Sequence, residues 1–126
     1  MKKSICVIDD DEIYQVIISS LLRKADVFSD SYFYTHPERA LKALSDNHHP
    51  LPDVILLDIN MPGMDGWEFL DLLCEMRDED MRCVEIYIVT SSIARSDKEK
   101  AAEYDEVSGF ISKPVGIGDL KQIGSA

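Results

Sequence analysis

Aspartates follow two apolar runs of the chain, at points where a strand would end. Asp9 and Asp10 come after the run 4–8, and Asp58 closes the run 54–57. Carboxylates that lie together repel one another, so a pocket built from them is stable only with a bound cation or a shared proton. If the two runs form neighbouring strands, these aspartates predict a site for a hard divalent metal and chemistry on a carboxylate.

Oxygen ligands of this kind suit Mg²⁺, which prefers octahedral geometry and usually keeps several waters beside its carboxylates. Acidic residues after a strand have a second explanation, because they also cap the helix that follows. Asp11 fits that explanation well, since it stands at the start of a helical segment. For Asp9 and Asp10, the matching Asp58 favours the metal.

Asp58 is the candidate nucleophile, because a carboxylate can take a phosphoryl group as an acyl phosphate. The oxygens of that group must be neutralised by a metal and by cationic or hydroxyl donors. Lys113 offers a cation and Thr90 a hydroxyl. Each has an ordinary explanation alone, as a surface charge or a β-branched strand residue. Together at one edge of a sheet, they predict a phosphoryl-acceptor site.

Apolar runs alternate with segments of helical period along the chain. The expected strands are 5–9, 31–34, 54–58, 84–90 and 109–112. The expected helices are 11–24, 37–46, 66–77, 97–104 and 119–123. Such alternation predicts a (βα)5 domain, a parallel sheet with helices on both faces. Ligand sites in these sheets lie beyond the carboxyl ends of the strands, where the aspartates, Thr90 and Lys113 all fall.

The sequence signals for a helix are stronger in the first of these segments than in the last. The first has an apolar stripe of the kind that faces a core, formed by Ile13, Val16, Ile17 and Leu21. The last is expected to be short, with glycines before and after it. Either this helix is marginal or the chain is part of a longer parent.

The composition suits a single domain over residues 1–126, with 45% hydrophobic residues. No apolar run approaches the ~20 residues that span a bilayer, and none after the first residues is long enough for a signal-peptide core. Three cysteines without a CxxC pair are expected to be reduced thiols in a cytoplasmic protein. A net charge of −11 spread along the chain argues against autonomous nucleic-acid binding.

Four motifs now stand in order along the chain. They are Val7-Ile8-Asp9-Asp10-Asp11, Leu57-Asp58-Ile59-Asn60-Met61-Pro62-Gly63-Met64-Asp65-Gly66, Val89-Thr90-Ser91 and Gly109-Phe110-Ile111-Ser112-Lys113-Pro114. With these motifs, essentially the whole chain closely resembles the receiver domain of two-component response regulators, in the CheY-like superfamily. The resemblance implies a three-layer, doubly wound, flavodoxin-like fold with strand order 2-1-3-4-5.

The resemblance also implies roles for the site residues. Asp58 would be phosphorylated from a phosphohistidine of a sensor histidine kinase or phosphotransfer protein. Mg²⁺ would be held by Asp9, Asp10, Asp58 and the backbone carbonyl of Asn60. Thr90 and Lys113 would bind the phosphoryl oxygens. Such a domain is a signalling module rather than an enzyme, and it catalyses only its own phosphorylation and dephosphorylation.

A switch is implied as well, in which Thr90 moves toward the phosphate and an aromatic residue on the fifth strand moves inward. That aromatic is Phe110 here, where many members carry Tyr, and a plain core role is its alternative. The output would be a protein-binding surface for a downstream target, on a monomer or a weak phosphorylation-dependent dimer. Asn60 and Ser92 occupy positions that tune phosphate lifetime across the family.

Two other classes of function were weighed. A haloacid-dehalogenase-type phosphatase would use Asp9 as nucleophile and Asp11 as acid, with Thr90 and Lys113 in its later motifs. It also needs an acidic metal motif after the lysine, where only Asp119 is found. A flavin- or nucleotide-binding module needs a loop rich in Gly, Ser or Thr after the first strand. The acidic loop of this chain would repel phosphate.

Overall fold

The computed structural model describes residues 2–46, 50–76, 83–91 and 95–125. Strands and helices alternate through these residues. In chain order they are β1 (Lys3–Ile8), α1 (Glu12–Ala25), β2 (Phe28–Tyr34), α2 (Pro37–Ser45), β3 (Val54–Asp58), α3 (Gly66–Glu75), β4 (Glu85–Thr90), α4 (Arg95–Ala101), β5 (Val107–Ser112) and α5 (Ile117–Ser125). None of the described helices is long and apolar enough to cross a bilayer.

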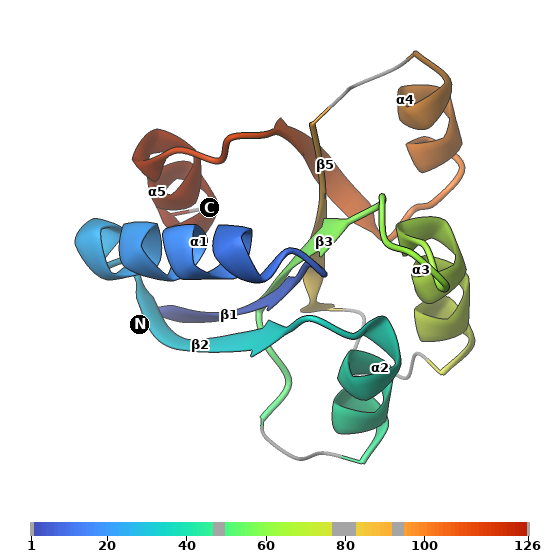
Figure 1. Ribbon diagram of the computed structural model, residues 1–126, viewed down its shortest axis with the longest axis horizontal. Coiled ribbons are helices and arrows are strands. Elements are labelled where there is room, and N and C mark those ends of the chain that lie inside the picture. The colour runs from blue at the N-terminus through green and yellow to red at the C-terminus, as the bar shows by residue number, and fades with distance from the viewer. Residues whose placement is uncertain (1, 47–49, 77–82, 92–94, 126) are drawn as a thin grey trace.

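The strands form one parallel sheet in the order β2-β1-β3-β4-β5. Helices α1 and α5 cover one face, and α2, α3 and α4 lie on the other side (Figure 1). This is the three-layer, doubly wound fold, with the strand order that the resemblance to receiver domains implies. The order makes β1 and β3 neighbours in the middle of the sheet, with their carboxyl ends at the same edge.

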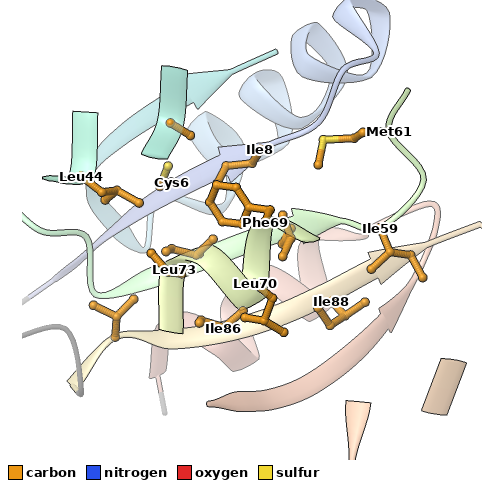
Figure 2. Close-up of a cluster of buried hydrophobic side chains, with 14 residues drawn as sticks. Cys6, Ile8, Leu44, Ile59, Met61, Phe69, Leu70, Leu73, Ile86 and Ile88 are labelled. Atoms are coloured by element: carbon orange, nitrogen blue, oxygen red, sulfur yellow. The ribbon is translucent and has the colours of Figure 1, made fainter. Parts of the chain in front are cut away.

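Each face of the sheet has its own hydrophobic core, because successive side chains of a strand point to opposite faces. In β1, Cys6 and Ile8 pack toward α2 and α3, where Phe69 and Leu70 of α3 are fully buried (Figure 2). Ile5 and Val7 pack instead toward α1 and α5. Both faces of the central strands are thus buried, which explains their lack of polar alternation.

Helix α1 presents a different face to the sheet from the one its apolar stripe predicts. The buried residues are Gln15, Ile18, Leu22 and Ala25. In contrast, Ile13, Val16 and Ile17 are 75%, 70% and 51% exposed. The expected core stripe was therefore wrong for these three residues, whereas Leu21 is partly buried and packs against the core beside α1 and α5. The helix carries two apolar rows, and the inner row was hidden from pattern analysis by the polar residue Gln15.

Helix α5 is longer than the sequence predicts, since it begins at Ile117 and runs to Ser125. Its first turn is fixed by the Asp119 carboxylate, which accepts a hydrogen bond from the Gly116 amide at 2.9 Å. Near its end, a Cβ on Gly124 would lie 2.8 Å from a methyl group of Val27. That glycine lies inside the helix because the helix packs closely there, and does not mark its end.

The other boundaries differ by a few residues. Strands β2 and β5 begin earlier than expected, at Phe28 and Val107, and α4 ends earlier, at Ala101. The polar, alternating sequence of β2 suits an edge strand with a partly exposed surface. The expected end of α3 at residue 77 lies outside the described residues.

Candidate metal centre

Asp9, Asp10 and Asp58 meet at the carboxyl ends of β1 and β3. Each offers a carboxylate oxygen, and these oxygens lie within 4.8 Å of one another. The register pairs Ile8 with Leu57, so the next residue of each chain segment stands at the same level of the sheet. Asp9 and Asp58 are buried, and Asp10 is partly buried. The structure thus brings together the three aspartates that the sequence singles out.

One oxygen of each buried carboxylate is held by its own loop. Asp9 Oδ1 accepts a hydrogen bond from the Asp11 amide at 2.9 Å, and Asp58 Oδ1 accepts one from the Asn60 amide at 3.1 Å. Both are turns in which an aspartate bonds the backbone two residues further on. The contacts fix the direction of the carboxylates and leave Oδ2 of each for a cation.

Helix α3 keeps the loop after Asp58 close to the strand. A Cβ on Gly66 would lie 2.5 Å from Ile59 Cα and 2.8 Å from the Asp58 carbonyl oxygen, so only glycine fits there. The Asp65 side chain caps the helix by accepting a hydrogen bond from the Glu68 amide at 2.9 Å.

Lys113 reaches the aspartates from the loop after β5. Its backbone amide donates to the Thr90 carbonyl at 2.9 Å, and its peptide bond to Pro114 is cis. Its Nζ lies 2.8 Å from Asp9 Oδ2 and 3.7 Å from Asp58 Oδ2. The ammonium group is therefore placed between the two buried carboxylates, where it partly offsets their charge.

The pKa of Asp58 is raised to about 6. Burial is the main cause, and the negative charges of Asp9 and Asp10 add to it. The Asn60 amide and the Lys113 ammonium oppose the rise. Asp58 is thus mostly ionised at neutral pH, in surroundings that favour any further positive charge.

The donor set fits Mg²⁺. Three carboxylates converge, and the buried Asp9 Oδ2 accepts no hydrogen bond from the described residues, although it pairs with the Lys113 ammonium. Hard oxygen donors with room for water are what this ion prefers. When bound, the metal would be held by Asp9, Asp10 and Asp58. The backbone carbonyl of Asn60 as a further ligand stays a prediction.

Thr90 ends β4 beside the carboxylates and is fully buried. Its hydroxyl oxygen accepts a hydrogen bond from the Asn60 side-chain amide at 3.4 Å. Phe110 is paired with Ile88 across β4 and β5, and side chains alternate along a strand, so Thr90 and Phe110 share one face of the sheet. Phe110 is half-buried against the core of that face. Ser92 lies outside the described residues.

Two residues of α1 were missed by sequence analysis. Gln15 is buried, and its Nε2 donates to the carbonyl oxygens of Asp9 and Tyr34 at 3.0 Å and of Val7 at 3.4 Å. It thereby ties the ends of β1 and β2 together beneath the metal centre. The available signal was the spacing of Gln15 and Ile18, which are three residues apart and therefore lie on the same face of the helix.

Tyr14 is the second missed residue. Its ring centroid lies 4.3 Å from Lys113 Nζ. Its hydroxyl is buried and lies beside the Val115 backbone, which acts on its pKa as a hydrogen-bond donor. The pKa of Tyr14 is raised to about 12, chiefly by burial and then by the charge of Asp9, so the phenol stays neutral. No spacing rule pointed to it, because the contact joins α1 to the loop after β5.

Similarity to known proteins identifies the family to which this chain belongs. A family model described as "Response regulator receiver domain" matches residues 5–124. The chain belongs to this family. As a receiver domain it has a phosphoacceptor role in signalling and is not an enzyme of the ordinary kind. Members of the family generally bind Mg²⁺ and interact with histidine kinases or phosphotransfer proteins and with downstream targets.

Individual relatives are similar along almost the full length of the receiver domain. The polar-differentiation response regulator DivK of Brucella ovis is 28% identical over 119 residues, which cover 93% of this chain and 89% of the relative. A two-component response regulator from Cytophaga hutchinsonii is 28% identical with a TM-score of 0.87, covering 98% of this chain and 95% of that one. The chemotaxis protein CheY4 of Vibrio cholerae, 20% identical with a TM-score of 0.79 and covering 98% and 96%, shares the fold.

The acidic residues needed by the phosphatase alternative are engaged elsewhere. Asp11 is the N-cap of α1 and accepts hydrogen bonds from the amides of Ile13 and Tyr14. Asp119 caps α5 through Gly116. Neither is placed as a second acid or as a late metal ligand, and the receiver family accounts for the same motifs.

Proposed function

We propose that this receiver domain accepts a phosphoryl group on Asp58 from a phosphohistidine of a sensor histidine kinase or phosphotransfer protein. The observation that carries the proposal is the position of Asp58. It ends β3, buried, with the Asp9 and Asp10 carboxylates beside it and the Lys113 ammonium 3.7 Å from its Oδ2. Asp58 Oδ2 therefore lies near the Lys113 ammonium and within the cluster of carboxylates that could bind a metal.

The reaction needs little from the protein except positioning and charge. A carboxylate oxygen of Asp58 attacks phosphorus, the bond from phosphorus to the donor imidazole nitrogen breaks, and the imidazole leaves and takes a proton. Lys113 pairs with one phosphoryl oxygen and the Thr90 hydroxyl donates to another. Mg²⁺, when bound, neutralises charge on the phosphoryl oxygens. Hydrolysis of the acyl phosphate at the same residues returns the domain to its starting state.

The signal would leave through the sheet face shared by Thr90 and Phe110. The Thr90 hydroxyl oxygen accepts a hydrogen bond from the Asn60 side chain that is long at 3.4 Å, and a move of Thr90 toward the phosphate would break this contact. Movement of Thr90 changes the space beside Phe110, which is only half-buried and can repack. The surface formed by α4, β5 and α5 would then bind a downstream protein, in the cytoplasm where such kinases present their phosphohistidine.

Beryllofluoride with Mg²⁺ tests this function, since it mimics a phosphoryl group on a carboxylate. We expect saturable changes in the amide resonances of Thr90 and Phe110 in the wild type and none in Asp58→Asn. Thr90→Ala should still bind beryllofluoride and lose the change at Phe110. A full response of Asp58→Asn would show that another residue is the acceptor.

A further inference from the structure

We propose that Tyr14 is a positioning residue for phosphoryl transfer, because its ring holds the Lys113 ammonium in place beside Asp58. The proposal rests on the proposed function, in which Lys113 pairs with a phosphoryl oxygen. Lys113 stands at the end of a flexible four-carbon side chain. The position of its ammonium group therefore depends on contacts with neighbouring residues. Two such contacts are present, one with the Asp9 carboxylate and one with the Tyr14 ring.

The first contact is ionic and the second is a cation–π contact. Lys113 Nζ lies 2.8 Å from Asp9 Oδ2 and 4.3 Å from the centroid of the Tyr14 ring. A cation within about 6 Å of a ring face is attracted to it, and the attraction strengthens when water is excluded. The Lys113 side chain is only 19% exposed. The ammonium is therefore enclosed by Asp9, Asp58 and the Tyr14 ring.

The ring itself is fixed by the start of α1. The Asp11 side chain caps the helix and accepts a hydrogen bond from the Tyr14 amide at 3.1 Å. The buried hydroxyl lies beside the Val115 backbone, in the loop that leads from β5 to α5, so the far end of the side chain is inside the protein. Because Asp11 follows Asp9 and Asp10 directly, the ring belongs to the same short loop and helix end as two of the proposed metal ligands.

The two contacts serve different states of the site. Lys113 must give up Asp9 Oδ2 when that oxygen serves a metal, and the Tyr14 ring is the contact that it keeps. A neutral ring can hold the ammonium without competing with the phosphoryl oxygens for its charge.

The test compares Tyr14→Phe, which keeps the ring, with Tyr14→Leu, which removes it. We measure the phosphorylation rate of the whole chain with acetyl phosphate and Mg²⁺. Tyr14→Phe should stay within about twofold of the wild type, and Tyr14→Leu should be roughly tenfold slower. Val16→Ala, at an exposed position of the same helix, is the control and should match the wild type.

A second measurement needs no phosphorylation. The ring current of Tyr14 should shift the Lys113 side-chain methylene protons upfield in the metal-free wild type and in Tyr14→Phe, but not in Tyr14→Leu. The proposal is overturned if the wild type lacks this shift, if Tyr14→Leu reacts at the wild-type rate, or if Tyr14→Phe falls as far as Tyr14→Leu. If no variant is phosphorylated but the shifts behave as expected, the contact stands and the proposed function fails.

Discussion

Asp58 is held in surroundings that disfavour its charge, and this sets the pH dependence of the metal-free protein. Its pKa is about 6 in the folded chain, against an ordinary value of 3.8. The folded state therefore binds the protonated form better. Its favourable contribution to stability is present below about pH 4 and is lost as the pH rises through about 6. Above that range, the charge of Asp58 destabilises the fold until a cation offsets it.

Replacing Asp58 by Asn should therefore stabilise the metal-free protein at neutral pH. Burial outweighs the opposing Asn60 and Lys113 contacts, so we expect a gain of about 2 kcal/mol in the free energy of unfolding at pH 7. The gain should nearly vanish at pH 4. Urea denaturation in EDTA at both pH values measures it, with Asp30→Asn, at an exposed aspartate of β2, as the control. An equal effect at both pH values would contradict the assigned pKa.

At the scale of elements, α1 has a buried row and an exposed row of apolar residues, and the sequence pattern did not distinguish them. Both rows of this helix are apolar at helical spacing, so hydrophobic period alone could not tell which row meets the sheet. The answer depends on Gln15, whose amide needs the three carbonyl oxygens at the ends of β1 and β2. With the amide nitrogen of Gln15 bonded to these carbonyl oxygens, Ile18 and Leu22 face inward and Ile13 and Val16 are in solvent.

The adjacent residues Ile17 and Ile18 give a matched test of this orientation. Ile18 is fully buried and Ile17 is 51% exposed. We expect Ile18→Ala to cost about 3 kcal/mol of unfolding free energy, through lost burial and a cavity, and Ile17→Ala less than about 1 kcal/mol. Chemical denaturation of both variants measures the difference. Equal costs, or a larger cost for Ile17→Ala, would mean that α1 is turned the other way.

At the scale of the whole molecule, the sheet order builds the site. Because β1 and β3 are neighbours, Asp9 and Asp58 reach the same edge, and the backbone bond from Lys113 to Thr90 brings the lysine across from β5. The alternation of buried strands and helices was sufficient to predict the parallel sheet, and the resemblance to receiver domains implied the strand order. The sequence was sufficient too for the cap at Asp11.

Contacts between distant segments could not be predicted in the same way. Tyr14 meets Lys113 across 99 positions of sequence only after the fold is complete. The length of α5 depends on the Asp119 cap and on the packing of Gly124 against Val27, whereas the sequence alone shows glycines at both ends that look like helix-breaking signals. At Gly124, local propensity was overridden by tertiary packing.

The central claim is that Asp58 is the residue that takes the phosphoryl group, and mass spectrometry of the intact protein tests it most directly. The chain is incubated with acetyl phosphate and Mg²⁺, and the modified residue is then located by peptide mapping. We predict a gain of one phosphoryl group, located at Asp58, absent without Mg²⁺ and absent in Asp58→Ala. A phosphoryl group located at Asp9, or a wild-type gain at an unchanged rate in Asp58→Ala, would contradict the assignment.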